Sequence, residues 1–134
     1  MQFFNGLRPL AQLLLRLGVG AVLLAHGYVK LVHMSPNMRA FGAMGLPPWL
    51  SVVAGFLEAG GGLLLILGLF SRVAALLLFF EMCFAIGFVH WRQGNWWQVK
   101  NYELALVCAV STFAIAAFGP GRASLDRLLL HDKG

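Results

Sequence analysis

A single carboxyl group stands in the middle of one of the most apolar stretches of the sequence. Glu58 lies within AGFLEAGGGLLLILG, residues 54–68. An ionisable side chain at membrane depth is costly and normally faces the interior of a helix bundle or a wet cavity. Gly55, Gly61 and Gly62 lie within about 60° of Glu58 on a helical wheel, so this face also admits another helix at close range. We therefore expect Glu58 to meet its partners on a neighbouring helix, in the first place the one formed by the first apolar stretch.

Six further ionisable side chains stand in or beside the apolar stretches. They are Arg16, His26, Lys30, Glu81, His90 and Glu103. Counted at about 1.5 Å per residue from the ends of these stretches, Glu58 and Glu81 lie near the membrane midplane, Arg16 lies toward one surface, and the other four lie toward the opposite surface. Buried charges need partners. We expect a structural ion pair of Arg16 with Glu81, and contacts of Glu58 with some of His26, Lys30 and Glu103.

The group around Glu58 could line a polar pocket for an amphiphilic ring such as a quinone. His and Glu side chains at moderate depth supply a donor, an acceptor and a proton route to a quinone carbonyl. The expected ligand-binding residues are His26, Lys30, Glu58, Glu103, His90 and Trp91. No catalytic residue is assigned. The alternative is that the ionisable groups only fix the register of the helices.

Electron transfer would need help from outside the chain. The sequence contains no haem-ligand pair, no flavin fingerprint and no glycine-rich nucleotide loop, so no intrinsic cofactor is expected. A bound quinone or a partner subunit would have to carry the electrons. Whether the chain is a subunit of an oxidoreductase is left open. We do not expect it to be an enzyme that acts alone.

Two other functions stay open. His33, Met34 and Met38, in the connection after the first apolar stretch, are ligand types that hold copper, although their spacing is no established metal motif and apolar contacts explain them as well. The chain could also be a non-catalytic membrane anchor or scaffold that docks a soluble partner enzyme through its loops or its basic tail.

Composition indicates an integral membrane protein. Of the 134 residues, 60% are hydrophobic and only 11% are charged, against about 25% charged in typical soluble domains. The formal net charge is +5, but the basic residues are scattered and form no patch, so nucleic acid is not an expected partner. Cys83 and Cys108 both lie inside apolar stretches, which excludes a disulfide framework or a Cys-x-x-Cys motif.

Four apolar stretches are expected to cross the bilayer as helices. Their approximate bounds are 9–31, 49–70, 73–91 and 101–119, and an amphipathic tail follows at 122–134. Spans of about this length cross a hydrocarbon core of about 30 Å. Pro9 suits the first turn of the first helix, and a tight turn at Ser71 and Arg72 would make the second and third helices an antiparallel hairpin.

The predicted fold is therefore all-α, a four-helix membrane bundle that forms a single domain over residues 1–134. An even number of spans places both termini on the same side of the membrane. A slight excess of basic residues near the helix ends favours the cytoplasm for the termini.

Seven short motifs follow one another along nearly the whole chain. They are Arg16-Leu17-Gly18; His26-Gly27-Tyr28 with Lys30-Leu31; Phe41 to Gly45-Leu46-Pro47; Glu58-Ala59-Gly60-Gly61; Gly68-Leu69-Phe70-Ser71-Arg72 with Ala74-Ala75; Tyr102-Glu103; and Gly119-Pro120-Gly121-Arg122-Ala123-Ser124-Leu125-Asp126. In this order they resemble the DoxX family of small bacterial membrane proteins.

The resemblance implies a four-helix bundle in the bacterial inner membrane. It also implies an association with redox chemistry, because the related DoxD proteins are subunits of a thiosulfate:quinone oxidoreductase. A homo-oligomer or partner protein subunits are expected on this basis. Glu81 departs from the family pattern, which usually has an apolar residue there, so no role is carried over to it.

Overall fold

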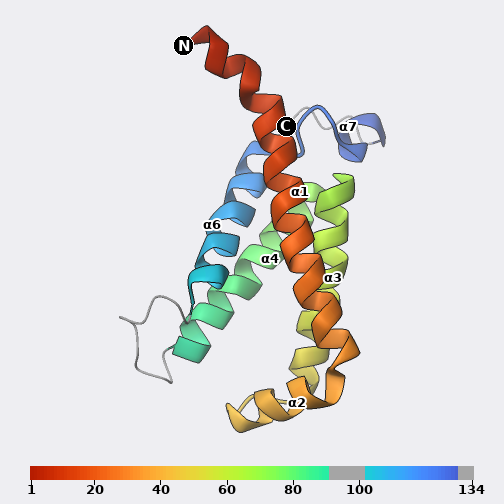
Figure 1. Cartoon of the computed structure of the whole chain (residues 1–134), viewed down its shortest axis with the longest axis vertical. Helices are drawn as coiled ribbons and strands as arrows, with labels where there is room; N and C mark the ends of the chain where they lie inside the picture. The colour runs from red at the N-terminus through yellow and green to blue at the C-terminus, as the bar shows by residue number, and fades with distance from the viewer. Residues whose placement is uncertain (91–101, 130–134) are drawn as a thin grey trace.

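The structure, a computed structural model, describes residues 1–90 and 102–129 and contains only helices as regular elements in these ranges. The helices are α1 (Gln2–Val32), α2 (Met34–Ala43), α3 (Trp49–Leu67), α4 (Ser71–Ala85), the π-helical η1 (Ile86–His90), α6 (Glu103–Phe118) and α7 (Leu125–Leu129). Figure 1 shows α1, α3, α4 and α6 forming a bundle along the long axis, with α2 across one end. The start of α1 and the short α7 lie at the other end.

The lengths of the helices fit a membrane protein. Three described helical segments, Gln2–Val32, Trp49–Leu67 and Ser71–Phe88, are long and apolar enough to cross a membrane. The fourth helix, α6, has 16 apolar-rich residues, or about 24 Å at 1.5 Å per residue, and is shorter than the expected span of 101–119. The prediction of an all-α four-helix membrane bundle is confirmed.

Two predicted helix boundaries differ from the structure. Pro9, expected at the first helical turn, lies inside α1 because the helix already begins at Gln2. The turn between α3 and α4 is formed by residues 68–70 instead of Ser71 and Arg72. Gly68, in the left-handed region with φ 70°, ends α3, and Phe70 with φ 49° precedes the first residue of α4. Glycine is favoured at such a helix end because it has no Cβ to clash.

Helices α1 and α3 pack with their backbones in direct contact. A Cβ added to Gly27 of α1 would lie 2.2 Å from the amide nitrogen of Ala59, and one added to Gly62 of α3 would lie 2.6 Å from the carbonyl oxygen of Gly20. The expected close approach of the glycine face of α3 to the first helix is confirmed at these positions. Gly61 faces α4 instead, where its Cβ would meet the Leu78 side chain at 2.9 Å.

Arg16 is almost fully buried, with 2% of its surface exposed, and binds backbone carbonyls from two distant parts of the chain. Its guanidinium donates to Leu65 O at 2.9 Å and to Ala123 O at 2.9 Å, and also to Pro120 O. The carbonyls in the last turn of α3 carry the negative end of the helix dipole, which favours a cation there. We call this arrangement of Arg16 with the end of α3 and residues 120–123 the Arg16 clasp.

Asp126 adds a second tie at the same end of the bundle. Its carboxylate accepts hydrogen bonds from the amides of Phe70 at 2.5 Å and Ser71 at 2.8 Å, and its own amide donates to Gly68 O at 2.8 Å. A carboxylate that accepts from amides at a helix N-terminus is a stabilising cap. Two side chains therefore fix the α3–α4 turn. Asp126 binds its amides, and Arg16 binds the end of α3 that leads into it.

Candidate functional site

The central feature of the site is a partly buried ion pair between α1 and α3. Lys30 Nζ lies 2.6 Å from Glu58 Oε1, and the Glu58 side chain is 5% exposed. Lys30 is in the last turn of α1, where the helix dipole favours a cation. Gly27, one turn earlier on the same face, allows α1 to approach α3 closely enough for this contact. The structure thus forms one of the pairings expected for Glu58.

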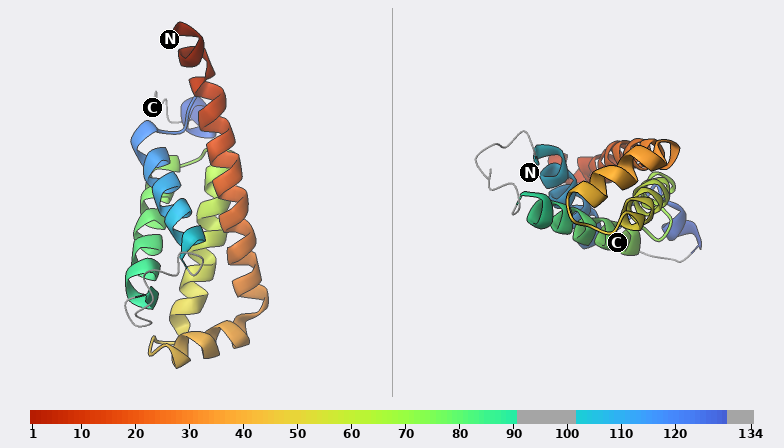
Figure 2. Two further views of the ribbon diagram at one scale, coloured as in Figure 1. Left: turned by 60° about the vertical axis from the view of Figure 1, so that its left-hand side comes forward. Right: turned by 90° about the horizontal axis from the view of Figure 1, so that it is seen from below.

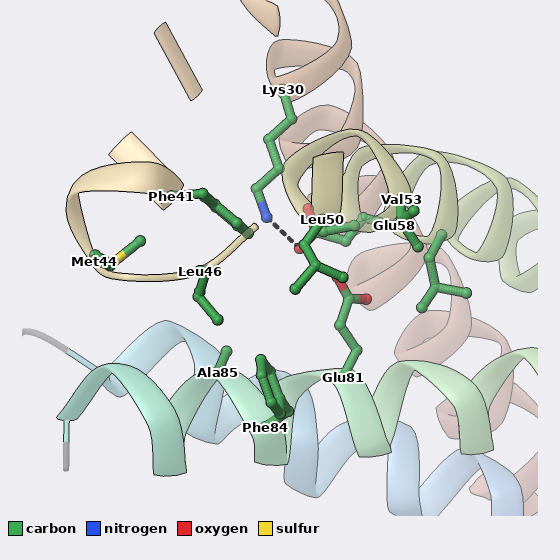
Figure 3. A pocket seen from close by; sticks show the side chains of 12 residues that line it. Lys30, Phe41, Met44, Leu46, Leu50, Val53, Glu58, Glu81, Phe84 and Ala85 are labelled. Atoms are coloured by element: carbon green, nitrogen blue, oxygen red, sulfur yellow. Dashed lines mark hydrogen bonds and ion pairs between the residues drawn. The ribbon is translucent and has the colours of Figure 1, made fainter. Parts of the chain in front are cut away.

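A second carboxyl group approaches the ion pair from α4. Figure 3 shows the Glu81 side chain directed toward Glu58, and Glu81 interacts electrostatically with both Glu58 and Lys30. Glu58 Oε2 and Glu81 Oε2 are both buried, and within the described ranges neither has a hydrogen-bond partner. Because buried polar atoms are nearly always hydrogen-bonded in native proteins, these two oxygens indicate a place for a further group.

A cavity of about 290 Å³ lies beside these side chains. We call it the main cavity. Its walls are mostly apolar and come from α3, α4, α2 and the connection after α2, and they include Phe41, Leu46, Leu50, Val53 and Phe84. Lys30, Glu58 and Glu81 also line it and meet on one side (Figure 3). The cavity therefore combines one polar wall with a largely apolar surface.

The shape of the bundle opens the main cavity toward the membrane. Helices α3 and α4 diverge from their turn toward one end of the bundle in the view of Figure 1, and Figure 2 shows α2 lying across that end. Val53 of α3 and Phe84 of α4 line the cavity and are 49% and 54% exposed. Apolar side chains exposed on the flank of a membrane bundle face lipid. A lipid-soluble molecule could therefore enter between α3 and α4.

A second, smaller cavity lies on the other side of the ion pair. It has a volume of about 180 Å³, is lined by residues of α1, α3, α4 and α6, and includes His26, Leu104 and Cys108. Lys30 and Glu58 line both cavities. The ion pair is thus shared by the walls of two separate cavities.

The structure separates the expected ligand-binding residues into groups. Lys30 and Glu58 line the main cavity, whereas His26 lines only the second cavity. Glu103 lies in the first turn of α6, is exposed, and is absent from the walls of both cavities. His90 ends η1, but its side chain is outside what the structure describes, and Trp91 lies outside the described residues altogether.

The expected Arg16–Glu81 ion pair is wrong. The Arg16 guanidinium donates its hydrogen bonds to the backbone carbonyls of the clasp, at the end of the bundle where α3 turns into α4. Glu81 is ten residues beyond the start of α4 at Ser71, about 15 Å along the helix, and faces Glu58 and Lys30. Glu81 therefore belongs with Glu58 and Lys30 and not with Arg16. The sequence contained a signal for this, because Glu81 and Glu58 have the same predicted depth in the membrane.

The copper hypothesis receives no additional ligands from the structure. His33 precedes α2, and Met34 and Met38 lie on α2. Among the described residues, no group of three or more His, Cys, Asp or Glu side chains could hold a metal ion.

The fold and the site together define a small helical membrane protein with a buried ionic group beside an apolar cavity. Residues 11–91 match the DoxX family, and the chain belongs to this family. The resemblance inferred from the seven motifs is confirmed.

Three curated bacterial proteins are similar over most of the chain. An uncharacterized protein of Haemophilus influenzae is 37% identical, over 89% of this chain and 90% of its own length. "Putative oxidoreductase CatD" of Bacillus subtilis is 29% identical, over 88% of this chain and 70% of its own length. The inner membrane protein YphA of Escherichia coli is 28% identical, over 92% of this chain and 94% of its own length. No solved structure matches the chain.

Proposed function

We propose that the protein is a bacterial inner-membrane subunit of a redox system and that its main cavity holds the ring of a quinone-like ligand. The observation that carries this proposal is the combination of an apolar, membrane-facing cavity with two buried carboxyl oxygens that have no partner among the described residues. An amphiphilic ring matches both halves of this surface. The names of two similar proteins, "Putative oxidoreductase CatD" and "Inner membrane protein YphA", are in keeping with it.

The size of the main cavity favours a ring head group over a whole isoprenoid quinone. Its volume of about 290 Å³ is at the lower end of the range of about 300–1,000 Å³ found for ligand pockets. A long tail would remain in the bilayer, outside the opening between Val53 and Phe84. When bound, a quinone would supply two-electron redox chemistry.

The residues of the chain bind and orient the ring. In this proposal Lys30, Glu58 and Glu81 form its polar contacts, while Phe41 and Phe84 form apolar walls. Glu81 thus replaces Glu103 in the set expected from the sequence. His26 lines the second cavity together with Lys30 and Glu58. The electrons come from a partner subunit, and we place the termini in the cytoplasm, as the distribution of basic residues favours.

Filling the main cavity tests this proposal. The purified protein in nanodiscs would be titrated with a short-chain ubiquinone analogue, with binding measured by calorimetry. Val53→Trp, in the cavity wall, should abolish binding, whereas Val107→Trp, on the exposed face of α6, should leave it unchanged. Glu58→Gln, which replaces a carboxyl oxygen of the polar wall by an amide that donates, should change binding in a folded protein.

Unchanged binding in both the Val53→Trp and Glu58→Gln variants would disprove the assignment of the main cavity. If the folded wild-type protein binds no ring compound at all, the scaffold function becomes the better account, and a soluble partner should then co-purify with the full chain.

A further inference from the structure

The polar wall of the main cavity offers mainly hydrogen-bond acceptors. Lys30 already donates to Glu58 Oε1 at 2.6 Å. Glu58 Oε2 and Glu81 Oε2 are buried and accept no hydrogen bond from the described residues. Glu58 is more than nine-tenths buried, with 4% of its surface exposed. The remaining residues that line the cavity have apolar side chains. A ligand that satisfies this wall must bring hydrogen-bond donors.

The oxidised and reduced forms of a quinone differ in this property. A quinone carries two carbonyl oxygens, which only accept, whereas a hydroquinone carries two hydroxyl groups, each of which can donate. A hydroxyl that donates to a carboxylate forms a short, charge-assisted hydrogen bond. A bound quinone would leave both free carboxyl oxygens buried and unpaired, which is unfavourable.

We propose that the main cavity binds the reduced, hydroxyl-bearing form of its ring ligand, a hydroquinone, more tightly than the oxidised form, with Glu58 Oε2 and Glu81 Oε2 as the acceptors. The inference rests on the proposed function, because it concerns the same cavity. Figure 3 shows the two carboxyl groups reaching the cavity from α3 and α4.

A preference for the reduced form changes the redox behaviour of the bound ligand. Tighter binding of the reduced form draws the couple toward reduction, so the midpoint potential of the bound couple rises above that of the free couple. For a two-electron couple, a tenfold preference corresponds to about 30 mV. The site would therefore retain hydroquinone when both forms are present in the membrane.

Competing titrations of both forms test the inference. The wild-type protein in nanodiscs, kept anaerobic, would be titrated with a short-chain ubiquinol and with the matching ubiquinone. We expect the ubiquinol to bind at least about tenfold more tightly, and a redox titration of the bound couple should show the corresponding rise of about 30 mV.

Two variants test whether the carboxyl acceptors in the cavity cause the preference for ubiquinol. Glu81→Gln replaces one oxygen by an amide that donates, so it should reduce the preference for ubiquinol and strengthen the binding of ubiquinone. Glu103→Gln makes the same change at an exposed position that lines neither cavity and should leave the preference unchanged.

Each outcome bears on a stated claim. Equal or tighter binding of ubiquinone to the wild-type protein would overturn the inference and leave the proposed function standing. Binding of neither form would overturn both. Displacement of ubiquinol by tetraphenylphosphonium, with tighter binding of this cation, would assign the carboxyl groups to positive charge and would also overturn the inference.

Discussion

Gly27 is the position where the contact between α1 and α3 leaves least room for a side chain. In a Gly27→Ala variant, the new Cβ would lie 2.2 Å from Ala59 N and 2.6 Å from Gly55 O, whereas ordinary contact begins at 3.4 Å. The shortfall is 3.4 − 2.2, or about 1.2 Å, and both opposing atoms belong to the backbone. The two helices therefore have to separate.

The expected loss of stability follows from two opposing effects. Overpacking typically costs about 1–3 kcal/mol, and the upper end applies here because a backbone cannot rotate out of the way. Alanine returns up to about 1 kcal/mol through its higher helix propensity. The free energy of unfolding should therefore fall by about 2 kcal/mol. Lys30 lies one turn further on the same helix face, so its ion pair with Glu58 should weaken as well.

Reversible unfolding in mixed detergent micelles, followed by helical circular dichroism, measures this effect. Gly18→Ala and Gly60→Ala are matched controls, because a Cβ at either position would meet nothing within 4 Å. These controls should be as stable as the wild type or up to about 1 kcal/mol more stable. A Gly27→Ala protein with the stability of these controls would refute the reasoning that Gly27 sets the distance between α1 and α3.

Three further substitutions test the buried charges. Lys30→Met should cost about 3–5 kcal/mol, because it leaves Glu58 buried without its cation; a double variant that also carries Glu58→Leu should be more stable than the single one, and the reverse order would contradict the ion pair. Arg16→Lys keeps the charge but loses the fork of donors that reaches α3 and the tail together, so limited proteolysis should cut the tail faster, and an unchanged rate would argue against the clasp. Asp126→Ala removes the cap of α4 and should cost about 0.5–2 kcal/mol, measured by the same unfolding titration. The neighbouring exposed Arg127→Ala should have little effect, and equal losses in the two variants would speak against the cap.

The sequence carried enough information to predict the helical bundle and the face of α3 that packs on α1. Long apolar stretches separated by polar connections are a strong signal of membrane helices. The glycines around Glu58 could be placed on one helical face because the period of an α-helix is fixed. Gly62 and Gly55 do lie against α1 in the structure.

The partners of the charged side chains were harder to predict. A helical wheel gives the direction of a side chain around one helix, but it does not give the rotation of that helix relative to its neighbours. Glu81 was therefore assigned to Arg16, whereas it faces Glu58. The partners of Arg16 are backbone carbonyls, which every residue carries, so no residue type in the sequence marked them. The walls that Phe41 and Leu46 contribute to the main cavity depend on how the connection after α1 folds back, which periodicity cannot show.

The Arg16 clasp joins residues that the ribosome makes far apart in time. Arg16 and Pro120 are 104 positions apart, which corresponds to about 5–20 s of synthesis at about 5–20 residues per second. Until residues 120–123 emerge from the ribosome, the guanidinium has only the carbonyls of α3 to bind. Without residues 120–123, Arg16 would stay buried beside the carbonyls of α3 alone, so the clasp is completed only after the four helices of the bundle have been made.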